Sequence, residues 1–160
     1  MIMRHLVIFA AAFLMSLALN AQEKTLRVDY IFSGTDKSSE ISLRQMYSHD
    51  GWAGRRVNMS DVPVRGNGQI SMTDPATGEV LYRQSFSTLF QEWQTTEEAT
   101  KVRKSFENVF LLPMPSEPAV VKVELYDFRG GVSASLSHVA DPKDCLLYTS
   151  PSPRDATLSR

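Results

Sequence analysis

Apolar and polar residues alternate along several short segments of this chain, and that period of two places successive side chains on opposite faces of a β-strand. The clearest case is the segment TLRVDYIF, residues 25–32. Its apolar set is Leu26, Val28, Tyr30 and Phe32, and the residues between them are Arg27, Asp29 and Ile31. The alternation predicts a strand with one buried face, and the turn-forming residues 33–40 interrupt it.

Further strands are predicted along the chain, each bounded by turn signals such as Asp50-Gly51 or Pro75 followed by Gly78. Residues 41–47 are one such strand. We expect Ile41 and Leu43 to lie on one face of it, together with Gln45 and Tyr47. A hairpin loop is expected between residues 68–72 and 80–86. The remaining predicted strands are residues 108–114, residues 119–128, where Val121, Val123 and Leu125 alternate with Lys122, Glu124 and Tyr126, and residues 131–139.

Residues 89–106 break this rhythm and predict one short helix of about two turns. Thr96 precedes Glu97 and Glu98, while the basic Lys101 and the run Arg103–Lys104 follow. Acidic residues at the start and basic residues at the end suit the helix dipole. With about seven short strands and this helix, the chain is predicted to be all-β, an antiparallel β-sandwich in preference to a barrel or an α/β fold.

The first 21 residues have the pattern of a secretory signal peptide. Arg4 and His5 precede the apolar run Leu6–Leu19, and Ala18 and Ala21 offer small residues at alternative cleavage sites. A membrane anchor is the alternative, but the run is shorter than the roughly 20 residues that span a bilayer. We therefore expect a protein that is secreted, periplasmic or at the cell surface, with no membrane segment after cleavage.

Residues 22–144, which follow the signal peptide and precede the tail, residues 145–160, are called the body of the chain. Their charge and their lack of cysteine exclude several classes of function. The whole chain has a net charge of −1, and the body is more negative because Arg4, Arg154 and Arg160 lie outside it. A nucleic-acid partner is not expected, since such proteins carry a basic stripe. The single cysteine, Cys145, also lies outside the body, which excludes disulfides and a thiol nucleophile there.

Candidate catalytic chemistry is sparse. The body has no HExxH, no GxSxG and no glycine-rich phosphate loop. His49-Asp50 beside Trp52 can be interpreted as a catalytic pair, although neighbouring residues on a turn rarely face each other. His138 is expected at the surface or in a cross-strand pair. We accordingly predict no catalytic, cofactor-binding or metal-binding residue.

Two further sets of residues leave alternatives open. Asp74, Asp127 and Asp141 each lie at a predicted turn, where carboxylates either bind Ca²⁺ or hydrogen-bond their own turn. The aromatic set comprises Phe86, Phe90, Trp93, Phe106 and Phe110. It either packs the helix and the core or forms an exposed platform. The second reading belongs to a free-standing secreted β-sandwich that binds glycan or protein, and it predicts an exposed Trp52 or Trp93.

Three longer segments, GWAGRR (51–56), SFSTLFQEW (85–93) and SFENVFLLPMP (105–115), carry a family resemblance that extends over residues 24–144. They are similar to the N-terminal domain of the IgA-peptidase family of zinc metallopeptidases, peptidase family sixty-four, common in gut Bacteroidetes. The resemblance implies a signal peptide, this β-rich domain, and then a catalytic domain whose HExxH-like motif binds zinc.

No part of that zinc motif occurs in this chain, so no ligand or general base is assigned to any position. The resemblance therefore implies a non-catalytic N-terminal domain whose partner is the catalytic domain of the same chain. It also implies that the full-length parent is a zinc-dependent hydrolase and that this fragment is not an enzyme.

The last segment, residues 145–160, lacks periodicity and contains the only cysteine. Codons can be chosen for Cys145–Asp155 that spell the read-through of a transposase-based sequencing-library adapter. We expect residues 145–160 to be a foreign, disordered and unpaired tail, and the native sequence to continue differently beyond Asp144.

Overall fold

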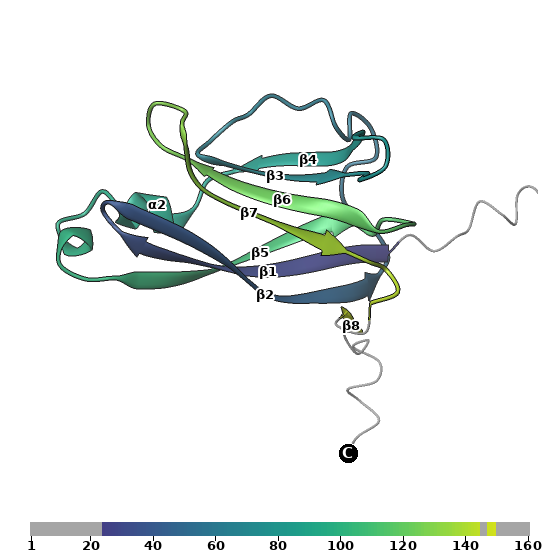
Figure 1. The fold of residues 1–160 in the computed structure, drawn as a ribbon, viewed down its shortest axis with the longest axis horizontal. Coiled ribbons are helices and arrows are strands. Elements are labelled where there is room, and N and C mark those ends of the chain that lie inside the picture. Colours follow the sequence, from purple (N-terminus) through teal and green to yellow (C-terminus); the bar gives the residue numbers. More distant parts are fainter. Residues whose placement is uncertain (1–23, 145–146, 150–160) are drawn as a thin grey trace, which may run out of the picture.

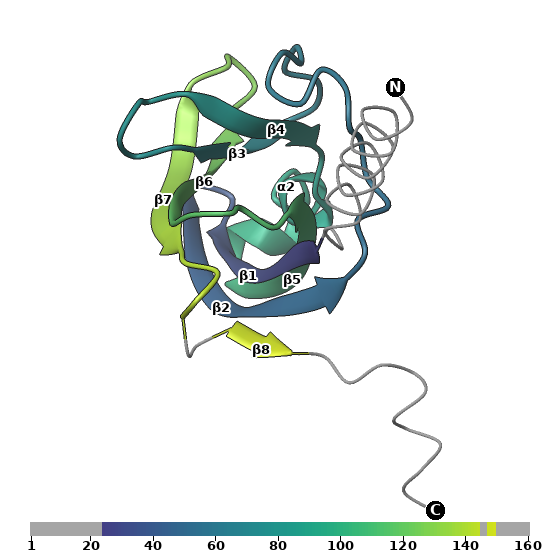
Figure 2. The same cartoon turned by 90° about the vertical axis from the view of Figure 1, so that its right-hand side faces the viewer.

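The computed structural model describes residues 24–144 and 147–149. Two four-stranded sheets lie face to face (Figure 1; Figure 2 gives the end-on view). The first has the order β5 (Lys104–Pro113), β1 (Lys24–Thr35), β2 (Ser38–Asp50) and β8 (Leu147–Thr149). The second has the order β4 (Val80–Phe86), β3 (Gly68–Thr73), β6 (Ala119–Tyr126) and β7 (Val132–Ala140). Except for β8, all pairings are antiparallel, which confirms the predicted β-sandwich.

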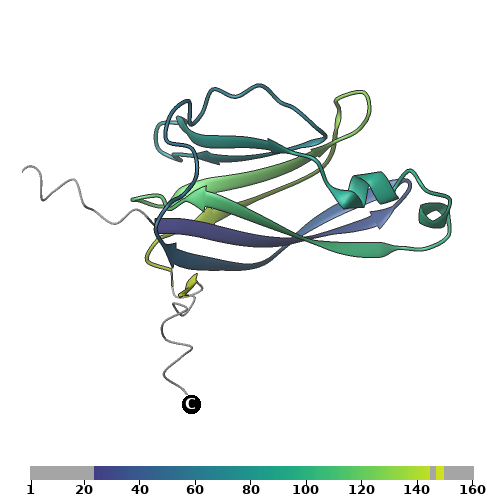
Figure 3. The ribbon, with the colours of Figure 1, turned by 180° about the vertical axis from the view of Figure 1, so that it is seen from behind.

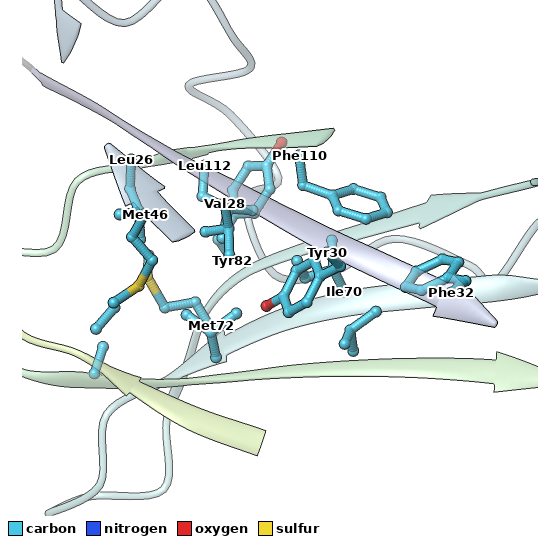
Figure 4. Close-up of a cluster of buried hydrophobic side chains, with 14 of the residues drawn as sticks. Leu26, Val28, Tyr30, Phe32, Met46, Ile70, Met72, Tyr82, Phe110 and Leu112 are labelled. Atoms are coloured by element: carbon cyan, nitrogen blue, oxygen red, sulfur yellow. The ribbon is translucent and has the colours of Figure 1, made fainter. Parts of the chain in front are cut away.

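The core lies between the sheets and follows the alternation of the sequence. On β1 the four apolar side chains of the first predicted strand are fully buried, and Figure 4 shows them pointing to the same side. The inward residues of β6, Val121, Val123 and Leu125, face them from the other sheet with no exposed surface. Each such side chain contributes roughly 1.5–3 kcal/mol through removal from water, so the alternating pattern accounts for the pairing of the two layers.

The predicted face of β2 is wrong in its second half. Leu43 pairs with Tyr30 and Gln45 pairs with Asp29, so Arg44 is an extra, bulged residue. One extra residue reverses the alternation. Leu43 therefore shares the inner face while Gln45 and Tyr47 lie outside, and Met46 enters the core with 5% of its surface exposed.

The predicted helix is also misplaced. The α-helix is α2 (Leu89–Trp93), and Glu98–Thr100 form only a single 3₁₀ turn, η1. Thr88 caps α2. The Thr96 hydroxyl donates to the Trp93 carbonyl at 2.7 Å at the end of α2, and its oxygen accepts from the Ala99 amide of η1 at 3.4 Å. Of the basic residues expected at the helix end, Lys101 follows η1 as its C-cap, whereas Lys104 begins β5 and pairs with Gly34 of β1.

The connection between β4 and β5 packs across one end of the sandwich. Seen from behind (Figure 3), α2 lies beside the tip of the β1–β2 hairpin. The Gln94 amide fixes this arrangement by donating to the Thr35 carbonyl at 2.6 Å and to the Ser38 carbonyl at 3.1 Å. None of the helices in the described ranges is long and apolar enough to cross a membrane.

Two of the outer strands are covered by extended segments. Residues 51–67, which climb from β2 to β3 (Figure 2), accept a hydrogen bond from the Arg83 amide of β4 at the Met59 carbonyl, 2.8 Å away. On the other sheet, β8 pairs in parallel with Met46–Ser48 of β2. The expectation of an unpaired tail therefore does not hold for residues 147–149, because β2 offers them a free backbone edge.

Candidate functional site

The GWAGRR segment forms a loop after β2 that is built around a buried tryptophan. Trp52 is 7% exposed, and its indole N–H donates to the Arg55 carbonyl at 3.1 Å. Its ring meets Tyr82 edge-on at 5.8 Å between centroids. A Cβ on Gly54 would lie 2.1 Å from the indole, so only glycine fits there.

Both arginines of the segment hold the loop in place. Arg55 donates to the carbonyls of Met59 and Arg83, at 3.1 and 2.5 Å, and its guanidinium lies 5.3 Å from the Tyr82 ring centre. Arg56 donates to the Trp52 carbonyl at 2.6 Å. Hydrogen bonds from a charged donor are stronger than neutral ones, so the segment that carries the family resemblance has a structural role.

Beside this loop lies an open cleft of about 1150 Å³, between the outer strands β4 and β5. Arg27 and His49 line its side on the first sheet, Tyr82 and Gln84 its side on the second, and Val109–Leu111 of β5 its rim. The lining combines apolar side chains with polar and charged ones, among them Arg27, Asp50 and Gln84, and the cleft is open to solvent. This geometry suits an extended polypeptide better than a small enclosed ligand.

Within this cleft the candidate pair His49-Asp50 is not assembled. His49 is half-buried and its nearest ring is that of Tyr47, at 6.3 Å between centroids. Successive strand residues point to opposite faces, and in the described part of the chain no hydrogen bond joins the His49 ring to the Asp50 carboxylate. The turn interpretation of Asp50-Gly51 fits better, since Gly51 has a φ of 81° and its carbonyl accepts from the Thr25 hydroxyl at 2.5 Å.

His138 lies on the inner face of β7 and links the two sheets, which differs from the predicted surface or cross-strand position. Its Nε2 is 2.6 Å from the Tyr30 hydroxyl of β1. Its Nδ1 is 3.3 Å from the Val139 carbonyl, which can only accept, so Nδ1 donates and the neutral Nε2 accepts from Tyr30. Burial lowers the pKa of His138 from its ordinary value and raises that of the Tyr30 hydroxyl. The pair therefore stays neutral, unlike a catalytic acid or base with free access to substrate.

The three turn aspartates each hydrogen-bond their own turn. Asp74 accepts from the amides of Ala76 and Thr77, bonds that lower the pKa of its carboxyl. Asp127 accepts from two amides in the β6–β7 turn, and Asp141 accepts from the Lys143 amide. Asp74 and Asp127 lie at opposite ends of the second sheet. The structure therefore does not bring these three carboxylates together around one ion.

The five aromatics pack against one another. Phe90 is fully buried and Phe110 is 7% exposed, and the Phe86 and Phe110 ring centres are 4.6 Å apart. Trp93 is partly buried between Phe90 and Phe106, at 6.2 and 5.6 Å, and its indole N–H donates to Glu98 at 2.8 Å. These contacts confirm the first interpretation of the aromatic set, in which it packs the helix and the core. With Trp52 buried as well, an exposed aromatic platform loses its main support.

Within residues 24–144 and 147–149, no three side chains of His, Cys, Asp or Glu gather closely enough to hold a metal ion. The family resemblance itself assigns zinc to the catalytic domain and not to these residues. The cleft itself was missed by the sequence analysis. Alternation assigns residues to faces, but it does not show that Tyr82 and Val109, 27 positions apart, line one cleft.

Comparison with known families gives one match. A family model described as Peptidase M64 N-terminus matches residues 18–137, which include the three segments that carry the resemblance. No curated protein matches the chain.

Proposed function

Because this chain belongs to the family of peptidase M64 N-termini, we propose that it is the non-catalytic accessory domain of a secreted zinc metallopeptidase of the IgA-peptidase type. The catalytic domain would follow in the same polypeptide and would be this domain's partner. Nucleic acid and membrane are not among the proposed partners.

The observation that carries the proposal is the extent of the family match. Residues 18–137 include six of the strands completely and reach into β7, so the match covers the sandwich as a unit. Within it, the most distinctive segment builds the loop around Trp52 and contributes no reactive group.

The chemistry proposed for the parent is hydrolysis of peptide bonds with a zinc-bound water. The two histidines of the described residues lie on different strands and have other contacts, so we assign zinc binding to the peptidase part alone. The role left for this domain is to cover, orient or stabilise that part. Secretion is proposed from the predicted signal peptide, whose residues lie outside the described ranges.

Long-read sequencing of the source locus tests this function. We expect the reading frame to continue past the codon for Asp144 into a zinc-binding motif with two histidines and a glutamate. A clean assembly with a stop codon directly after Asp144 would contradict the proposal. The same reads show whether residues 145–160 occur in the genome at all.

A further inference from the structure

The outer side of β5 is a free backbone edge. In the described part of the chain β5 pairs only with β1, although its ten residues make it one of the longer strands. Val109 and Leu111 stand on its outer face with 50% and 52% of their surface exposed. Free strand edges with apolar side chains invite pairing with another strand. Within the described ranges β7 likewise pairs only with β6, the Arg83 amide of β4 is bound by the Met59 carbonyl, and β2 pairs with β8, which belongs to the segment expected to be foreign. β5 differs from β7 in that its residues line the cleft described above.

The cleft described above runs beside this edge, between β5 and the Trp52 loop. A strand added to β5 would alternate its side chains between the outer face, next to Val109 and Leu111, and the cleft, next to Tyr82 and Arg55. Backbone groups and apolar pockets together are the recognition elements for an extended polypeptide. A sugar or a compact folded surface would leave the backbone edge unpaired.

The cleft lies at the end of the sandwich from which β7 leaves. In the first sheet, Thr25 pairs with His49 and with Pro113 at that end. In the second sheet, Ala119 pairs with Ala140 at the corresponding end. In Figure 1 the arrows of β2 and β7 both point toward this end of the sandwich. A segment that follows β7 therefore starts at the end of the domain that carries the cleft, on the side of β2, and crosses the width of the first sheet to reach β5.

From these features we infer that the free edge of β5 and the adjacent cleft, here called the β5 groove, receive an extended segment of the peptidase part of the same polypeptide. The inference rests on the proposed function and adds the surface and the mode of contact, strand addition. Tethering supplies an effective concentration in the millimolar range for short connections. A groove of modest apolar area is therefore sufficient, because the partner needs no independent affinity.

Photo-crosslinking in the full parent polypeptide tests the inference. Benzoylphenylalanine replaces Val109 in one protein and Val139 in another. Val139 is a matched control, since it is also a valine on an outer strand, with 56% of its surface exposed, but on β7. We expect the probe at position 109 to crosslink within the same chain to the peptidase part, and the probe at 139 to do so at most weakly.

Hydrogen exchange gives a second readout that needs no partner assignment. In the parent, the pair of substitutions Val109→Lys and Leu111→Lys should speed amide exchange in β5 by about tenfold or more, because charge on the groove weakens strand addition. Val139→Lys should leave β5 exchange unchanged. Both variants are also compared by melting temperature, so that global unfolding is recognised.

Several outcomes would overturn the inference: no crosslink from position 109, equal crosslinking from 109 and 139, or crosslinks only to a second copy or to another protein. Unchanged β5 exchange in the double variant would also overturn it. These failures differ from failure of the proposed function, which the locus alone decides. If the parent has a peptidase domain but neither crosslinking nor hydrogen exchange detects a contact at the β5 groove, only the inference is refuted.

Discussion

At the scale of single residues, polar side chains with several hydrogen bonds hold neighbouring segments of the fold together. Arg55 binds two carbonyls of neighbouring segments, and Asp29, only 4% exposed, accepts from Arg27 and Gln45 on the outer face of the first sheet. Burial raises the pKa of the Asp29 carboxyl, but these hydrogen bonds outweigh it and lower the pKa overall. Hydrogen bonds of this kind specify which loop packs where.

The neutral link between His138 and Tyr30 predicts a pH dependence of stability. The folded-state pKa of His138 is below its unfolded value of 6.5, because burial disfavours the charged ring. Its contribution to the free energy of unfolding is therefore present above pH 6.5 and is lost as the pH falls below it. In urea unfolding at pH 7.5 and 5.0, His138→Gln should lose less stability between the two pH values than the original protein.

His49→Gln is the control for that experiment, because His49 lies on the outside of β2, away from the core. Its pH-dependent loss is measured alongside, so that the effect is assigned to the position of His138 and not to the removal of any histidine. An identical loss in the His138→Gln protein would contradict the assignment.

At the scale of elements, α2 is held by its contacts more than by its length. Five residues are too few for a stable isolated helix. Phe90 anchors it in the core, and the Gln91 amide donates to the carbonyls of Asn67 and Tyr126 at 3.0 and 2.9 Å. The helix thereby ties the start of β3 to the end of β6.

Removal of the cap of α2 should therefore weaken the whole domain. Thr88 is 4% exposed, and its hydroxyl oxygen accepts from the backbone N–H of Gln91 at 3.1 Å. We expect Thr88→Ala to lower the free energy of unfolding by about 1 kcal/mol, measured by urea denaturation at neutral pH. Thr88→Ser keeps the oxygen and should recover most of the loss. Equal stability of the Ala variant and the original protein would show that the cap contributes nothing.

At the scale of the whole molecule, stability resides in the seven strands β1 to β7 and the core between them. The strand β8 adds only three residues at the edge of β2. That pairing is short and parallel, and parallel pairs are slightly less stable per residue than antiparallel ones. A tail of foreign origin is compatible with it.

A chain that ends at Asp144 should accordingly unfold with a free energy within about ±0.5 kcal/mol of the full chain. Met46→Ala is the positive control in the same urea titration. Met46 is buried in the core beside that edge, and its truncation should cost about 2–5 kcal/mol. A loss above about 1 kcal/mol on removal of residues 145–160 would show that β8 is an integral strand.

The sequence by itself determined the strands, their buried faces on β1 and β6, and the absence of local catalytic motifs, because alternation is a property of neighbouring residues. The family could likewise be inferred from short segments such as GWAGRR. The bulge at Arg44, the site of α2 and the link from His138 to Tyr30 were decided by tertiary structure. They depend on which segment lies opposite, and partners that are distant in sequence, 108 positions apart for His138 and Tyr30, leave no trace in a local pattern. The β5 groove belongs to the same class, since the cleft beside β5 forms only where the two sheets pack together.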